Sequence, residues 1–296
     1  MLKKTMVEKE IKKLLEKNWE AKIIILTDLD ATLLDHNTYS FKPALDAINL
    51  AKSKGIDIIF VTSKTKAETE LYRKSMDINK PFIVENGGAL YIPSGHFKKY
   101  LIGEPLGIVN GMLVKIFGLR RDELLDIMVD IKTVSRLKIN NMAEMSIDEI
   151  SAITFLSQDE SELARMREYS EPFIIQNKIS DSEEVDLINI IKSKGLNVTK
   201  GGRFYHLMGE NDKGKAALYL IEIYRKFHKC KIISIGIGDS KNDIPLLKNV
   251  DIPIAVQRPE GEYNSNLIEE TSPFLSGGIG PFGWNKGLLK IFSLLN

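Results

Sequence analysis

The chain contains Ile23-Ile24-Ile25-Leu26-Thr27-Asp28-Leu29-Asp30, an apolar stretch that ends in a pair of aspartates. A short run rich in β-branched residues is typical of a buried strand in a parallel sheet. Ligands of open α/β sheets bind at the carboxyl ends of such strands. Asp28 and Asp30 lie two positions apart at that end, so their side chains face one side and repel each other. The pair therefore predicts a bound cation, most simply Mg²⁺.

Strand and helix patterns alternate in both terminal parts of the chain. Apolar runs predict strands over residues 23–26, 56–61, 82–84, 231–237 and 252–256. Helices are expected between them, over residues 41–54, 66–76 and 213–227. This alternation predicts a doubly wound, Rossmann-like α/β core with a parallel sheet.

The middle of the chain lacks this alternation. It contains turns rich in Gly and Pro, candidate helices over 121–133 and 181–194, and a candidate strand over 152–156. The pattern predicts an α+β cap domain inserted into the core. We expect the following division: N-terminal helical extension 1–20, core 21–89 and 209–296, and cap 90–208.

The composition limits the kinds of partner. With 41 basic and 40 acidic residues, the net charge of +1 argues against a dedicated nucleic-acid binder. The single cysteine, Cys230, allows no internal disulfide and fits a reducing cytoplasm. No apolar run approaches the roughly 20 residues that span a bilayer, and Lys and Glu interrupt the N-terminus where a signal peptide would be apolar. We therefore expect a cytoplasmic protein with a small-molecule partner, and neither nucleic acid nor membrane.

Polar groups recur at the predicted strand and helix ends. They are Asp28 with Asp30, Thr62-Ser63, Lys213, and the segment Gly238-Asp239-Ser240-Lys241-Asn242-Asp243. Taken singly, each has a structural explanation, because Thr or Ser often caps a helix and a lysine in a first helical turn is usually solvated. Together they form the set that phosphoryl transfer requires: a carboxylate nucleophile, an acid/base, and cations and donors around the transferred group.

Each group has a distinct expected role in that reaction. Asp28 would attack phosphorus and form an aspartyl-phosphate, and Asp30 would protonate the leaving oxygen and then activate water. Lys213 would bind both the phosphoryl group and Asp28. The Thr62 hydroxyl and neighbouring groups, Ser63 and Lys64 among them, would bind phosphoryl oxygens.

A Mg²⁺ ion prefers hard oxygen ligands. The expected ligands are the carboxylates of Asp28 and Asp239 and the backbone carbonyl of Asp30, with Asp243 as a further ligand or acting through a water molecule.

These motifs resemble those of the haloacid dehalogenase superfamily of phosphatases, and they occur in that superfamily's order. The resemblance implies the same nucleophile, acid/base, lysine and metal carboxylates, with Mg²⁺ as the cofactor. An aspartate at position 30 favours a phosphatase over a dehalogenase. Many members have Gly where this chain has Ala31, so we expect the loop either to avoid a positive φ there or to be strained.

Further segments resemble the mannosyl-3-phosphoglycerate phosphatases of that superfamily. They are residues 62–65, 85–88, 167–173, 201–209, 211–216 and 280–284. The resemblance implies hydrolysis of mannosyl-3-phosphoglycerate to mannosylglycerate, a compatible solute. Because guanidinium groups bind carboxylates bidentately, Arg167 and Arg203 are the candidates for the glycerate carboxylate. Ser170 and Glu171 are the candidates for sugar hydroxyls, whereas His206 is expected to pack rather than to bind.

Other functions remain compatible with these residues. The substrate could be another sugar phosphate, such as glucosyl-3-phosphoglycerate, sucrose phosphate or a hexose phosphate. A phosphomutase would share the nucleophile. A phosphosugar-binding regulator without turnover is a third class, but binding alone does not require Asp30.

Overall fold

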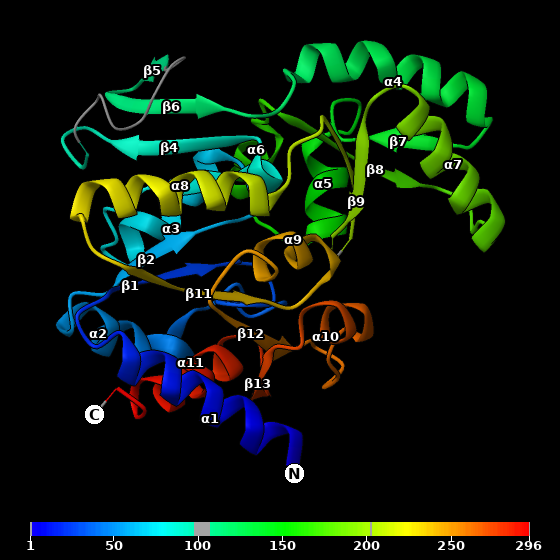
Figure 1. The fold of residues 1–296 in the computed structure, drawn as a ribbon. Helices are drawn as coiled ribbons and strands as arrows, with labels where there is room; N and C mark the ends of the chain where they lie inside the picture. Colours follow the sequence, from blue (N-terminus) through cyan, green and yellow to red (C-terminus); the bar gives the residue numbers. More distant parts are fainter. Residues whose placement is uncertain (1, 98–106, 202, 296) are drawn as a thin grey trace.

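A five-stranded parallel sheet forms the centre of the computed structural model, which describes residues 2–97, 107–201 and 203–295 (Figure 1). Its strand order is β13-β12-β11-β1-β2. The strands are β1 (Lys22–Thr27), β2 (Asp57–Phe60), β11 (Ile232–Gly238), β12 (Ile252–Gln257) and β13 (Phe274–Ile279). The predicted parallel α/β core is therefore confirmed.

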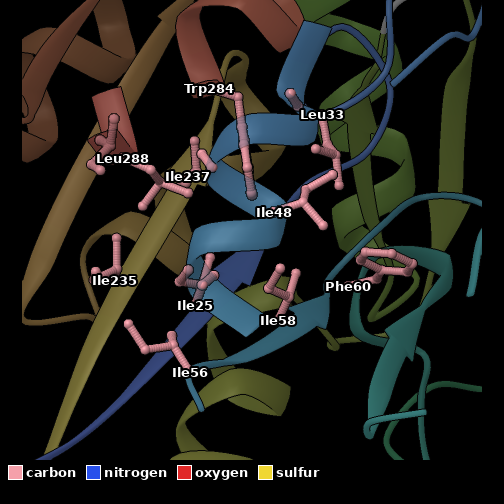
Figure 2. Packing of buried hydrophobic residues seen from close by; sticks show 14 of the residues in the cluster. Ile25, Leu33, Ile48, Ile56, Ile58, Phe60, Ile235, Ile237, Trp284 and Leu288 are labelled. Atoms are coloured by element: carbon pink, nitrogen blue, oxygen red, sulfur yellow. The ribbon is translucent and has the colours of Figure 1, made fainter. Parts of the chain in front are cut away.

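Helices cover both faces of this sheet. They are α1 (Leu2–Lys17), α2 (Leu45–Ser53), α3 (Lys66–Ser75), α8 (Lys213–His228), α9 (Ile244–Leu247), α10 (Ser265–Thr271) and α11 (Gly280–Phe292), with short 3-10 turns η1 (Lys42–Ala44), η2 (Glu85–Gly87) and η4 (Lys241–Asp243). Successive strand residues point to opposite faces, so Ile25 packs with α2 and α11 while Ile24 packs with α8. Figure 2 shows the first face, where Trp284 and Leu288 of α11 lie over Ile237.

A second sheet is antiparallel and has the order β3-β4-β6-β5. Its strands are β3 (Phe82–Val84), β4 (Ala89–Pro93), β5 (Gly107–Val109) and β6 (Met112–Ile116). A parallel bridge from Val61 to Ile83 joins it to the central sheet. Leu90 and Ile92 of β4 pack in the same hydrophobic cluster as α8. The second sheet therefore extends the core.

The third sheet, also antiparallel, lies apart in the green region of Figure 1. Its order β7-β8-β10-β9 comprises β7 (Ile139–Asn141), β8 (Ser170–Ile175), β10 (Tyr205–Met208) and β9 (Asn197–Lys200). The helices of this region are α4 (Arg121–Ser135), α5 (Ile147–Thr154), α6 (Gln158–Arg165) and α7 (Asp181–Ser193). Leu124 of α4, Phe173 of β8 and Leu187 of α7 share a separate hydrophobic cluster. This is the arrangement expected of an inserted α+β cap.

One predicted element is wrong: residues 152–156 do not form a strand. Their first part belongs to α5, which a reciprocal capping box between Ser146 and Glu149 initiates. Phe155 then adopts a left-handed conformation with φ of 63° and ends the helix. An apolar run this short does not distinguish a strand from a buried helix by its period, whereas the Ser146–Glu149 capping signal before it indicates a helix.

No helix in the described part of the chain is both long and apolar enough to cross a bilayer. Gly202, which belongs to one of the family-like segments, lies outside the described residues.

Candidate active site

Lys213 joins two aspartates at the carboxyl end of the central sheet. It is the first residue of α8, and its fully buried Nζ lies 2.6 Å from Asp28 Oδ1 and 2.6 Å from Asp243 Oδ1. Asp28 directly follows β1, and Asp243 lies in the turn after β11. The Asp28 and Asp243 segments meet because parallel strands deliver their carboxyl ends to one edge, and the N-terminus of α8 brings Lys213 to that edge. Although burial alone lowers the pKa of Lys213, Asp243 and Asp28 raise it above its usual value.

Asp239 completes a buried acidic triad with these two residues. One carboxylate oxygen of each lies within 4.8 Å of the other two. Asp243 Oδ2 accepts hydrogen bonds from the backbone N–H groups of Asp239 and Ser240, whereas Asp239 Oδ1 accepts one from Thr32 Oγ1 at 3.2 Å. Burial raises the pKa of Asp28 to about 7 despite the opposing effect of Lys213. Burial and the two neighbouring carboxylates raise the pKa of Asp239 well above its usual value.

The triad fits a divalent metal ion. Three buried carboxylates lie close together, with the Lys213 ammonium in contact with Asp28 and Asp243, and like charges this close disfavour ionisation unless a further cation binds. Their oxygens are the hard ligands that Mg²⁺ prefers. Asp28, Asp239 and Asp243 are therefore the residues that would hold Mg²⁺. The role of the Asp30 backbone carbonyl as a further ligand remains a prediction.

Asp30 lies beside a second lysine. Lys64 Nζ is 3.0 Å from Asp30 Oδ1 and 3.2 Å from Glu68 Oε1. Burial alone would lower the pKa of Lys64, but Asp30 and Glu68 raise it well above its usual value. The Asp30 side chain remains 38 % exposed, unlike that of Asp28. It is therefore accessible to both a bound ligand and water, as an acid/base must be.

Thr62 and Ser63 follow β2 at the same edge. The buried Thr62 Oγ1 accepts a hydrogen bond from the Lys64 N–H at 3.1 Å. Ser63 and Lys64 line a cavity of about 1290 Å³ that Asp28 and Asp30 also line. Of the predicted phosphate-binding residues, Ser63 and Lys64 thus face the open space, and Thr62 orders the loop beneath them.

Ala31 adopts a left-handed backbone conformation, which residues other than glycine rarely adopt. Its φ is 57°, a value that costs an L-residue roughly 1–2 kcal/mol relative to glycine. The loop therefore bears strain next to Asp30 instead of avoiding the positive φ.

Two arginines of the cap line the same cavity. Arg167 donates from one terminal nitrogen to the Ser63 carbonyl and to Ser170 Oγ, each at 3.0 Å, while its buried Nε has no partner among the described residues. Arg203 donates to Tyr39 Oη at 3.2 Å and lies 5.1 Å from the ring centroid of Phe155. Both arginines therefore line the cavity that Asp28 also lines, and their binding of a glycerate carboxylate stays a prediction.

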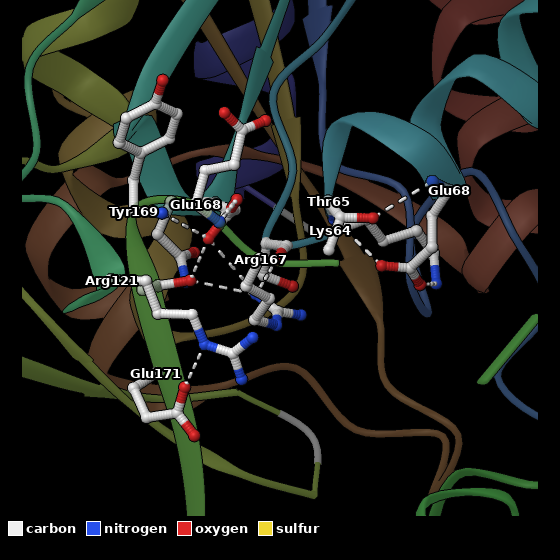
Figure 3. Close-up of polar contacts among 12 residues, drawn as sticks. Lys64, Thr65, Glu68, Arg121, Arg167, Glu168, Tyr169 and Glu171 are labelled. Carbon is white, nitrogen blue, oxygen red and sulfur yellow. Dashed lines mark hydrogen bonds and ion pairs between the residues drawn. The ribbon is translucent and has the colours of Figure 1, made fainter. Parts of the chain in front are cut away.

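Ser170 and Glu171 are occupied within the protein. Both are buried, and neither is among the described residues that line the cavity. Glu171 accepts a hydrogen bond from Arg121 Nε at 2.6 Å (Figure 3). It also accepts hydrogen bonds from the Asn141 side chain and from the Ala143 N–H. We therefore correct the sequence-based assignment of these two side chains to sugar hydroxyls, because their hydrogen-bonding capacity serves the cap.

His206 is nine-tenths buried on β10 and lines the cavity. Burial, assisted by Arg167 and Lys213, lowers its pKa well below its usual value, so the ring is neutral near pH 7. His206 is packed within the cap, as expected, and one side of the residue lines the cavity.

Sequence reasoning missed three polar residues near the site. Glu68 was not assigned, although its position four residues after Lys64 in a helix could have indicated the pair. Tyr39, with φ of 54°, donates to the Thr154 carbonyl and so connects the Asp28 loop with the cap. Glu85 is buried and binds the cap backbone, and no local pattern signals such a contact.

The chain is similar to known proteins over most of its length. The family model described as haloacid dehalogenase-like hydrolase matches residues 25–263. A glucosyl-3-phosphoglycerate/mannosyl-3-phosphoglycerate phosphatase of Methanococcoides burtonii is 41 % identical over 275 residues, which cover 93 % of this chain and 99 % of that protein. A mannosyl-3-phosphoglycerate phosphatase of Pyrococcus furiosus is 36 % identical over 250 residues, 83 % of this chain and 97 % of that protein.

A solved structure from Thermoplasma acidophilum has the same fold. It superimposes with a TM-score of 0.61 at 20 % identity and covers 93 % of this chain and 99 % of that one.

Proposed function

Because the chain belongs to the haloacid dehalogenase-like hydrolase family, we propose that it is a phosphatase that forms an aspartyl-phosphate on Asp28 and hydrolyses mannosyl-3-phosphoglycerate to mannosylglycerate and phosphate. The observation that carries the proposal is the contact of Lys213 with both Asp28 and Asp243 at 2.6 Å. This ammonium orients Asp28 and would meet the charge of a phosphoryl group placed beside it.

Asp28 and Asp30 divide the chemistry. Asp28 Oδ2 is free of the lysine contact and attacks phosphorus, while the ester bond to the leaving oxygen breaks. Asp30 gives its proton to that oxygen and then, as a carboxylate, takes a proton from the water that hydrolyses the intermediate. The Lys64 ammonium lies 3.0 Å from Asp30 Oδ1 and would orient that carboxyl group beside the cavity.

The acidic triad would hold Mg²⁺ as the cofactor. When bound, the ion would supply positive charge against the phosphoryl oxygens. The chain's own contribution is to keep Asp239 and Asp243 fixed by hydrogen bonds from Thr32 and from backbone N–H groups.

The cap would select the leaving group. Arg167 and Arg203 are cations on the cap side of the cavity, and the glycerate carboxylate is the anionic group of the substrate other than the phosphate.

We propose a cap of about residues 119–208, narrower than the 90–208 predicted, because β4 packs with α8 of the core. A cytoplasmic location also remains a prediction, supported by the free Cys230.

Phosphate release from a panel of esters tests the proposal. The panel contains mannosyl-3-phosphoglycerate, glucosyl-3-phosphoglycerate, sucrose phosphate and a hexose phosphate, each with Mg²⁺ and with EDTA. We expect Mg²⁺-dependent release with the highest kcat/KM on the mannosyl ester. The glucosyl ester is the second candidate substrate because the relative from Methanococcoides burtonii is named for both. Equal kcat/KM on all four esters would refute the substrate assignment.

The Asp28→Asn variant separates an enzyme from a binding protein. We expect a folded variant whose turnover is at least about 10³-fold lower, because the nucleophile is absent. Isomerisation of the hexose phosphate without phosphate release would instead indicate a phosphomutase. If the wild-type protein releases no phosphate from any ester, the result would favour a phosphosugar-binding regulator.

A further inference from the structure

The turn Glu85–Gly88 lies where the core meets both chain crossings into the cap. The Gly88 carbonyl accepts hydrogen bonds from the N–H groups of Phe117 and Gly118, on the outgoing crossing. The Asn86 carbonyl accepts one from the side chain of Asn211, on the returning crossing. This turn of the core is therefore hydrogen-bonded to both segments that connect the core with the cap.

Glu85 binds a third cap segment, the start of β8. Its Oε1 accepts from the Glu168 N–H at 2.9 Å, and its Oε2 accepts from the Tyr169 N–H at 3.0 Å and from Ser170 Oγ at 2.6 Å. Arg167 lies 4.0 Å from Oε2. The side chain is 1 % exposed, so solvent cannot replace these contacts. Since all of its partners are donors, only the carboxylate form satisfies them.

The same turn is bound to the active-site loops. The Glu85 N–H donates to the Lys64 carbonyl at 3.0 Å, and the Asn86 N–H donates to the Thr62 carbonyl at 2.9 Å. Asn242, next to the metal-binding Asp243, donates to Asn86 Oδ1 at 3.0 Å. A shift of this turn would therefore move the cap relative to the reacting groups.

Arg167 is a cap residue of the cavity wall whose neighbours are held by Glu85. It immediately precedes the two N–H groups that Glu85 binds, and it donates to Ser170 Oγ, which in turn donates to Glu85. It also donates to the Ser63 carbonyl. Figure 3 shows Arg167 between the β8 segment and the loop that carries Lys64.

We infer that Glu85 is a positioning residue: by holding the backbone at 168–169 and the hydroxyl of Ser170, it fixes Arg167 on the cavity wall and so determines selectivity for a leaving group that bears a carboxylate. This inference rests on the proposed function for its substrate. Glu85 itself does not reach the substrate, since it is not among the described residues that line the cavity.

The test is Glu85→Gln, which places an amide NH₂ against at least one donor and breaks that contact. In hydrogen–deuterium exchange, we expect the amides of Glu168 and Tyr169 to lose protection. The value of kcat/KM for mannosyl-3-phosphoglycerate should fall about ten- to hundredfold, because Arg167 loses a charge-assisted contact with the glycerate carboxylate. A small aryl phosphate has no such group, and its kcat/KM should change less than about threefold.

Asp57→Asn is the matched control. Asp57 is also a buried carboxylate held by three donors, Tyr224 Oη, Lys22 and Lys80, but it begins β2 at the far end of the sheet. We expect this variant to keep both the exchange protection at 168–169 and the ratio of the two kcat/KM values. If Glu85→Gln fails to fold, Ser170→Ala removes only the hydroxyl link to Arg167 and should lower the same ratio.

Two results would overturn the inference: unchanged exchange at 168–169 in Glu85→Gln, or an equal loss of kcat/KM on both esters. The exchange measurement needs no turnover, so it decides whether Glu85 holds the backbone at 168–169 even if the proposed substrate is wrong. Absence of turnover in the wild-type protein refutes the proposed function alone.

Discussion

Replacing the proposed nucleophile should stabilise the metal-free protein. One carboxylate oxygen each of Asp28, Asp239 and Asp243 lies within 4.8 Å of the other two, and Lys213 contacts Asp28 and Asp243. Burial and this crowding raise the pKa of Asp28 from 3.8 to about 7. Its ionised form therefore costs free energy of folding, and the cost grows as the pH rises from the unfolded-state value to the folded-state value.

The pKa shift gives the expected size of the effect. Each pKa unit corresponds to about 1.4 kcal/mol, so the upper value for Asp28→Asn above pH 7 is about 4 kcal/mol. The amide loses the ionic contact with Lys213, whose effect is already included in the net shift. We expect a gain of at least about 1 kcal/mol in the free energy of unfolding in EDTA at pH 8.

Urea unfolding with EDTA and with saturating Mg²⁺ is the assay. A ligand at a hundredfold excess over its Kd stabilises the native state by about 2.7 kcal/mol, so Mg²⁺ should stabilise the wild-type protein more than the variant. Asp126→Asn, at an exposed position of α4, is the control and should change stability by less than about 0.5 kcal/mol. If Asp28→Asn is no more stable than the wild-type protein in EDTA, the reasoning about crowded carboxylates is refuted.

Three further variants test other contacts. Lys213→Met should lower the free energy of unfolding in EDTA by about 3–5 kcal/mol, since it leaves buried carboxylates uncompensated; a loss under 1 kcal/mol in urea unfolding would contradict this. Ala31→Gly should stabilise the protein by about 0.5–1 kcal/mol through relief of the positive φ, and a lower Tm would contradict it. His206 has a lowered folded-state pKa, so its contribution to stability is present above the unfolded-state value near 6.5 and is lost as the pH falls toward the folded-state value. In that window the free energy of unfolding of the wild-type protein should depend on pH with a slope that is steeper than that of His206→Gln by up to about 1.4 kcal/mol per pH unit. Equal slopes for the two proteins, measured by urea unfolding at several pH values, would contradict this.

The core and the meeting of its polar groups at one edge could be predicted because the positions of these groups follow from strand and helix ends. Once the run before Asp28 is a parallel strand, the end of every neighbouring strand lies at the same edge. Asp239 is thereby brought to Asp28 although it lies far along the sequence, and Lys213 meets them from the first residue of α8. The motif therefore predicts which edge of the sheet these side chains occupy.

The cap could not be predicted to the same depth. Glu171 and Arg167 are near neighbours on one segment, yet one is buried inside the cap and the other lines the cavity. Which of two such polar residues faces a ligand depends on tertiary packing, as with the Arg121 contact that occupies Glu171. Glu85 was missed for the same reason, since its partners are backbone groups more than eighty residues away.

The most direct test of the account is a covalent one. Wild-type protein mixed with Mg²⁺ and mannosyl-3-phosphoglycerate is quenched in acid within the first turnover, digested and analysed by mass spectrometry. We predict the mass of one phosphoryl group on the peptide that contains Asp28, on that residue, and none in Asp28→Asn. Phosphate release without a phosphorylated peptide at any quench time, or a phosphoryl group on another residue, would contradict the assignment of Asp28 as the nucleophile.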